Sequence, residues 1–376
     1  MTTSRRDEEF AEYEAIRKEE DDTSARERAT ELGERTGDPL LRAVTKSEEI
    51  RRSRSLGEQQ RAVVAGAELL PLVAALGGIL SDEDSRVQWA LGLIAGGLGT
   101  ACYSALDVPE VPFAAIDALI EAYARLLADL GYREFAADRI RARRHYVAGD
   151  DDRVAAIVEG LMPHVNYTNA YRQRLGCPGC VLSSVAWYLG PEADLVLLEE
   201  MLTPVFEGQM NYPNENPGFI RWLRQNRETY CENAQSSHLY LARAHLWRGH
   251  VAVAEEHVPH LRHFDLDECF LLPTIFFLEL AMASGDAARI RERIDLLRPR
   301  VEGHEDVEEG MLGAIRVAQA LALLGENEAE QGDLWRFAEA CAARLDGRLE
   351  RPRHLQIVRD ERAKGAPFLA AIAAAS

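Results

Sequence analysis

Residues 239–257 read LYLARAHLWRGHVAVAEEH, in which one apolar segment runs into a glycine and a second, amphipathic segment follows directly. Glycine can close a helix in the left-handed conformation because it has no Cβ atom to clash with the backbone. The stretch therefore predicts two helices that meet at Gly249. Small and large apolar residues are spaced along both segments, so we expect the pair to pack as a helical hairpin.

The same pattern recurs at other glycines along the chain. These are Gly149, Gly190, Gly285 and Gly325. Together with Gly249 they follow one another at intervals of 41, 59, 36 and 40 residues. Three of the four intervals fall near the periods of about 34–47 residues that are typical of helix-pair repeats. The sequence predicts an all-α protein, an α-solenoid of degenerate tetratricopeptide-like hairpins over residues 61–376.

Helical periodicity also dominates elsewhere, while the alternating pattern of β-strands is hard to find. Residues 113–131, FAAIDALIEAYARLLADLG, place large apolar side chains at helical spacing. The two most apolar stretches, 65–80 and 90–106, are shorter than the roughly 20 residues that a membrane span needs. We expect both to be buried helices, and the glycines of GGLGTA (96–101) to allow close helix packing.

Residues 1–60 carry many charges of both signs and few large apolar groups. Such a segment buries little apolar surface against its ordering entropy, so we expect it to be flexible or a solvated helix. Asp38-Pro39 predicts a break within it. The basic run RRSR (51–54) is flanked by glutamates, and we expect it to be a solvated helix face.

The chain has 376 residues and a formal charge of −19. A polyanion would be repelled by this charge, so we expect no nucleic-acid partner. The first residues lack the apolar core of a secretory signal, and we expect neither export nor a membrane partner. Six cysteines in a chain of this kind point to a reducing, cytoplasmic setting.

An insertion explains the single long interval. Residues 208–231 read GQMNYPNENPGFIRWLRQNRETYC, and their prolines, glycines and asparagines interrupt helices. We expect a protruding loop at about 208–230, and inserted loops in solenoids often lie on the binding face. Tyr212, Arg221 and Trp222 are the expected partner-binding residues, because aromatic and arginine side chains anchor interfaces.

Two cysteine segments carry the candidate metal site. LGCPGC (175–180) contains Cys177 and Cys180, and CENAQSSH (231–238) places Cys231 and His238 two helical turns apart. A redox pair would be expected after a strand, which is absent from the predicted surroundings. Two alternatives remain, which are small residues packed between repeats and a structural zinc held by Cys177, Cys180, Cys231 and His238.

Histidines cluster just downstream. EHVPHLRH contains His257, His260 and His263 at three-residue spacing, which would keep the imidazoles near one helix edge. Such a cluster could bind a metal or respond to pH, or its members could be exposed or capping residues.

Three stretches carry a resemblance to a known group. They are 105–144, which contains the helix entry LDVPEVP, 176–190, which opens with the C-x-x-C pair, and 231–257, where a Cys, Glu and Gln cluster leads into a hairpin. They resemble an uncharacterised actinobacterial group of tetratricopeptide-like helical repeat proteins with a CxxC…C segment. The resemblance implies an interaction scaffold and no named reaction. The Asn- and Pro-rich insertion departs from the group's pattern.

We therefore expect a protein or peptide interaction scaffold of tetratricopeptide-like type, stapled by one structural zinc. The alternative is an enzyme or tailoring factor with a pocket between repeats that uses the metal or the histidine cluster. No G-x-S-x-G or H-E-x-x-H motif occurs in the sequence. A peptide-sensing regulator is the least favoured class, because neither terminus carries a basic recognition helix.

Overall fold

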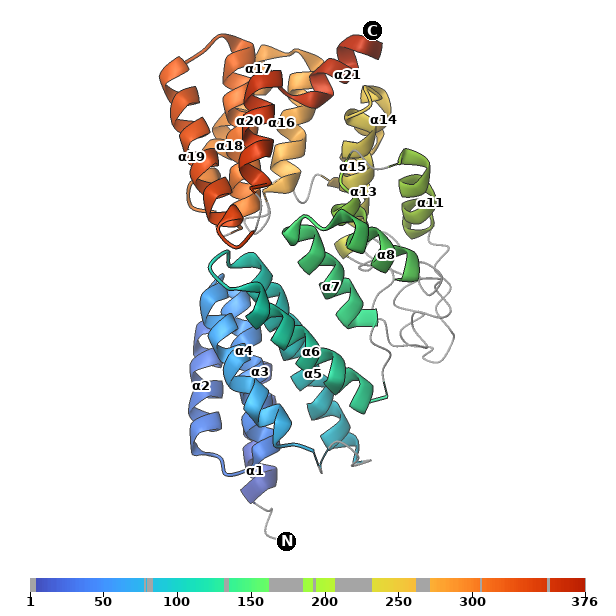
Figure 1. The fold of residues 1–376 in the computed structure, drawn as a ribbon. Coiled ribbons are helices and arrows are strands. Elements are labelled where there is room, and N and C mark those ends of the chain that lie inside the picture. The colour runs from blue at the N-terminus through green and yellow to red at the C-terminus, as the bar shows by residue number, and fades with distance from the viewer. Residues whose placement is uncertain are drawn as a thin grey trace. The chain divides into compact units, whose positions relative to one another are not determined.

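The computed structural model describes residues 5–77, 79, 84–131, 135–161, 185–191, 194–206, 232–261, 271–304, 306–349 and 352–375 (Figure 1). Every regular element within these ranges is a helix, which confirms the all-α class. The chain divides into two compact units, Met1–Arg153 and Val154–Ser376. The boundary expected near residue 60 falls inside the first unit, within the helix Gln59–Ala74.

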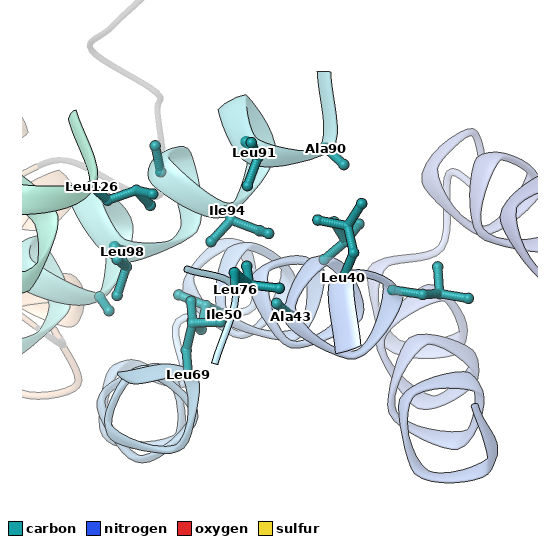
Figure 2. Packing of buried hydrophobic residues seen from close by; sticks show 14 of the residues in the cluster. Leu40, Ala43, Ile50, Leu69, Leu76, Ala90, Leu91, Ile94, Leu98 and Leu126 are labelled. Atoms are coloured by element: carbon teal, nitrogen blue, oxygen red, sulfur yellow. The ribbon is translucent and has the colours of Figure 1, made fainter. Parts of the chain in front are cut away.

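The described residues of the first unit form seven helices, and an eighth crosses the boundary. They are α1 (Arg5–Arg17), α2 (Asp22–Arg35), α3 (Pro39–Ser55), α4 (Gln59–Ala74), α5 (Ser85–Asp107), α6 (Phe113–Asp129), α7 (Phe135–Ala148) and the boundary helix α8 (Asp151–Leu161). Helix α3 lies at the centre, because it packs on α2, α4 and α5. Figure 2 shows part of the resulting core, in which Leu40 and Ile50 of α3 lie among apolar side chains of α4 and α5.

Glycine allows α5 to approach its neighbours closely, as GGLGTA predicts. A Cβ atom on Gly97 would lie 2.9 Å from the Cα atom of Ser47 on α3. A Cβ atom on Gly66 of α4 would lie 2.5 Å from the Cβ atom of Ala101 on α5. Side chains at either glycine would push the helices apart, so these residues serve packing.

The N-terminal 60 residues differ from the expectation of a flexible or solvated segment. Residues 5–55 form α1, α2 and α3, and Phe10, Tyr13 and Ile16 of α1 are at most 2% exposed. Few apolar residues suffice in α1 because these three lie three residues apart, on one face of the helix. The break at Asp38-Pro39 is confirmed, since α3 begins at Pro39 and the Asp38 carboxylate accepts from the Leu40 and Leu41 amides.

The expectation of a solvated face is wrong for Arg52 in the RRSR run. Arg52 is only 4% exposed, and its guanidinium donates to Glu48 at 2.8 Å and to the Arg17 carbonyl at 3.1 Å. It also forms an ion pair with Asp22. One guanidinium has five N–H donors, so a single side chain can tie α3 to both α1 and α2.

The other described helices lie in the second unit. They are α11 (Leu195–Phe206), α13 (Glu232–Leu246), α14 (Val251–Glu256), α15 (Val258–Leu261), α16 (Leu272–Ser284), α17 (Ala287–Val301), α18 (Val307–Leu324), α19 (Glu328–Asp346), α20 (His354–Lys364) and α21 (Pro367–Ala375). Residues 185–189 are also helical. One core lies among α16 to α21, and a smaller one joins α13, α14 and α15 to α16.

All five glycines of the repeated pattern adopt the left-handed conformation. Their φ angles are 73° at Gly149, 72° at Gly190, 79° at Gly249, 69° at Gly285 and 68° at Gly325. Each glycine lies between a helix that ends and a helix that begins. The pairs α13–α14, α16–α17 and α18–α19 pack against each other, so the predicted helical hairpins are present at these three glycines.

One described helix, α5, is long and apolar enough to cross a membrane by length and composition. Of its most apolar window, 67% is buried inside the protein, which agrees with the expectation of a buried helix.

The left-handed glycines lead to a direct prediction. Replacing Gly285 by Ala should lower the free energy of unfolding by about 1–2 kcal/mol, because a Cβ atom clashes with the backbone in this conformation. No atom lies within 4 Å of the added Cβ, so the cost is one of backbone conformation. Gly303→Ala is the matched control, since Gly303 is equally open but does not adopt a positive φ. Equal urea midpoints for the two variants would contradict the assignment.

Candidate functional site

Most of the residues singled out by the sequence lie outside the described residues. These are the expected metal ligands Cys177, Cys180 and Cys231, the expected contact residues Tyr212, Arg221 and Trp222, and His263 of the histidine cluster. His238, the fourth expected ligand, lies on α13 and is half-buried. It is the residue from which the candidate site can be built.

The hairpin at Gly249 brings His238 together with two downstream histidines. His257 lies in the turn between α14 and α15, and its Nδ1 atom is 2.9 Å from Nδ1 of His238. The exposed ring of His260 on α15 stacks on the His238 ring, with centroids 4.2 Å apart and planes 4° apart. The sequence spacing of the cluster predicted neighbouring imidazoles, but it did not predict that His238 would be one of them.

Burial controls the charge of the two central rings. Desolvation, reinforced by the neighbouring imidazoles, lowers the pKa of His238 to about 3 and the pKa of His257 to about 4. Both rings are therefore uncharged at neutral pH. Two uncharged imidazoles can approach this closely because one Nδ1 donates its hydrogen and the other accepts it.

A second pair of histidines, His245 and His250, lies on either side of Gly249. Nδ1 of His245 on α13 is 3.5 Å from Nδ1 of His250, which is exposed at the start of α14. The other ring nitrogen of His245 lies 3.4 Å from a carboxylate oxygen of Glu199 on α11. Within the described ranges, however, no three His, Cys, Asp or Glu side chains converge as the ligands of a metal ion would.

A buried network of charges joins four helices of the same unit. Glu279 on α16 has no exposed side-chain surface, and it accepts two hydrogen bonds of 2.9 Å from Arg243 on α13. It accepts a third, of 2.8 Å, from Arg316 on α18. Arg316 in turn donates to both carboxylate oxygens of Glu361 on α20, at 2.7 and 3.1 Å. Gln319 completes the network, since its amide donates to Glu361 at 2.9 Å.

The charges of this network cancel, because two guanidinium groups face two carboxylates. Burial alone would raise the pKa of Glu279, but Arg243 and Arg316 outweigh it and lower that pKa from its ordinary value of 4.5. The Arg316 guanidinium also lies 5.6 Å from the centre of the Trp247 ring. A carboxylate held ionised by two permanent cations is poorly suited to proton transfer, so the network is structural.

Sequence reasoning missed this network, although a signal for it exists. Glu279 is the sole charge in PTIFFLELAMAS, and Arg316 is the sole charge in MLGAIRVAQALALL. A single charge within an apolar helix must either face solvent or meet an opposite charge inside the protein. Its partner cannot be identified from one sequence, because the partners lie 36, 37 and 45 residues apart along the chain.

The first unit has a surface hollow between α1 and α5. It is lined by Glu14, Arg17, Lys18, Ser85, Arg86 and Trp89. The Arg17 guanidinium lies 5.1 Å from the centre of the Trp89 ring. Among these lining residues, no histidine or cysteine accompanies Ser85, so the hollow lacks the partners of a catalytic nucleophile.

No protein-family model, curated protein or solved structure matches the chain. The function must therefore be argued from its own residues.

Removing one member of the network tests its structural role. Glu279→Gln should lower the free energy of unfolding by about 3–5 kcal/mol, because it leaves Arg243 and Arg316 buried without their shared carboxylate. Urea unfolding followed by circular dichroism measures the loss. Glu292→Gln on the exposed face of α17 is the matched control and should change it by less than about 0.5 kcal/mol. A loss below about 1 kcal/mol for Glu279→Gln would show that the network is dispensable.

The same carboxylate predicts a pH dependence. Because the pKa of Glu279 is lower in the folded than in the unfolded chain, its stabilising effect is complete above its ordinary value of 4.5 and is lost as the pH falls below it. The difference in unfolding free energy between the wild type and Glu279→Gln should therefore shrink as the pH falls below about 4.5. Repeating the urea titrations above and below this pH measures it, and a constant difference would contradict the assignment.

Proposed function

We propose that the chain is a cytoplasmic α-solenoid of tetratricopeptide-like hairpins that binds a protein or peptide and carries a structural zinc. The observation that carries the proposal is the series of helix pairs joined at left-handed glycines. Hairpins of this kind cannot bury both apolar faces alone, and stacking them creates an extended surface for binding.

Packing within the second unit supports the solenoid. Helices α16 and α17 form one hairpin, α18 and α19 form the next, and α16 also packs on α18. The first helices of consecutive hairpins thus contact each other, as they do in a stack of helix-pair repeats. The two glycines that join these hairpins are 40 residues apart.

The buried network supports a binding role more than a catalytic one. Its charged groups join α13, α16, α18 and α20. Because they pair with one another, they are not available to act on a substrate.

The net charge supports a protein partner, and the free cysteines support a reducing compartment. A formal charge of −19 favours a basic protein segment and disfavours nucleic acid. Cys102 and Cys341 are free thiols, as is usual in a reducing compartment. We assign partner contacts to Tyr212, Arg221 and Trp222 of the insertion, because such side chains anchor interfaces.

The zinc would be held by Cys177, Cys180, Cys231 and His238. Four protein ligands leave no open position on zinc, so a site of this composition stabilises a fold and does not activate water.

The binding proposal predicts the effect of changing the insertion. Proteins that bind the intact chain would be captured from the source cells, purified, and titrated against it by calorimetry. Replacing Tyr212, Arg221 and Trp222 together by Ala should weaken binding at least about tenfold, since each residue is a candidate hot spot. Glu292→Gln should leave the affinity unchanged. Equal affinities for the triple variant and the wild type, or no saturable partner, would refute this assignment.

A further inference from the structure

We propose that helix α21 (Pro367–Ala375) is a built-in peptide that covers a binding face on α13, α16 and α18, and that an apolar partner helix with an aromatic anchor binds there in its place. The inference rests on the peptide-binding function proposed above and adds a second surface to it, separate from the insertion. It concerns the described residues of the second unit.

Helix α21 meets the first helices of three successive hairpins. It packs mainly on α16. The centre of its Phe368 ring lies 6.4 Å from that of Trp247, the residue after α13, and 5.9 Å from the Arg316 guanidinium of α18. A helix that only capped the stack would pack mainly on the last hairpin. Successive hairpins present the extended surface on which such stacks bind their partners, so α21 takes the position of a ligand.

Few side chains attach α21 to this face. Phe368 has no exposed surface, and Ile372 packs against both cores of the unit. The outer side of the helix is exposed at Pro367, Ala370 and Ala373. Its nine residues, PFLAAIAAA, include no charged side chain. Isolated helices shorter than about 12–15 residues are marginal in water, so α21 depends on this attachment, and Phe368 is its main anchor.

The connection between α20 and α21 can act as a hinge. Helix α20 ends at Lys364, and Gly365 then adopts φ 77° and ψ −170°. This region of backbone conformation is essentially restricted to glycine. No atom lies within 4 Å of a Cβ atom added to Gly365, so no packing contact holds this residue in place. The conformation of one exposed residue therefore decides whether α21 folds back onto α16.

The covered face keeps a hydrogen-bond donor that α21 does not use. Nε1 of Trp247 is buried and has no acceptor among the described residues. Helix α21 meets this side chain with the apolar ring of Phe368. A buried N–H without an acceptor costs free energy, so a partner that places an oxygen beside Nε1 gains a bond that α21 does not make. The partner that fits is an apolar helix with one aromatic ring and an acceptor next to it.

A synthetic, fluorescently labelled peptide of residues 365–376 (GAPFLAAIAAAS) tests the inference on the full-length chain by anisotropy. Phe368→Ala removes the anchor of the chain's own α21. This variant should bind the peptide saturably and at least about tenfold more tightly than the wild type, where the tethered helix competes at a high effective concentration. The same peptide carrying Phe368→Ala should bind at least about tenfold more weakly. Ala373→Ser, on the exposed side of α21, is the matched control and should behave as the wild type.

A second variant releases α21 without changing the covered face. Gly365→Ala disfavours the backbone conformation of the hinge, so it should also bind the peptide more tightly than the wild type. Far-UV circular dichroism shows whether both variants are folded. Loss of the helical signal in both would show that α21 belongs to the core, and this result would overturn the inference.

The outcomes separate this inference from the proposed function on which it rests. No saturable binding of the peptide to folded Phe368→Ala, or equal affinities of the wild type and both variants, would overturn the role of α21. Binding of a partner through the insertion would then still stand, because it is measured with the captured partner and the triple variant. If the triple variant binds that partner as tightly as the wild type, the insertion is wrong, and tighter peptide binding by Phe368→Ala would still support the face under α21.

Discussion

A carboxylate with no access to water constrains the whole second unit. Glu279 lies in the middle of an otherwise apolar helix, and an isolated charge there would be prohibitively unfavourable. Arg243 and Arg316 make the burial possible, and Glu361 neutralises the second arginine. These groups come from α13, α16, α18 and α20. If one of the four helices shifts, a charged side chain is either exposed to water or left buried without its partner. The apolar contacts hold these helices together, and the network fixes their register.

The first unit also contains a buried charged side chain that joins several helices. Arg52 is buried on α3 and contacts α1 through the Ile16 and Arg17 carbonyls and α2 through Asp22. This highly charged segment is folded, because its charged side chains pair with one another around the buried apolar residues. Composition averages over a segment, whereas burial depends on which face of a helix each charge occupies.

Local features could be predicted from the sequence, and long-range pairings could not. The left-handed glycines and the α3 start at Pro39 depend on a few neighbouring residues, and both are present. The glycines of GGLGTA predict a close helix approach, but they do not predict that Gly97 meets Ser47 on α3. Arg243 and Glu279 are 36 residues apart in the sequence, and His238 and His257 are 19 residues apart. Each contact depends on how the segments that carry the two residues pack against each other. Spacing along one helix can place His238 on one face, but it cannot identify the residue that His238 meets after the hairpin turn. The cysteine pair and the insertion remain predictions.

Native-state hydrogen exchange tests most directly whether the buried network makes these helices one unit. If it does, the slowest amides of α13, α16, α18 and α20 should exchange through a single opening, with a common free energy and a common dependence on urea. Independent opening of α20, at a free energy several kcal/mol below that of α16, would contradict this account. It would show that apolar packing alone holds each helix in place.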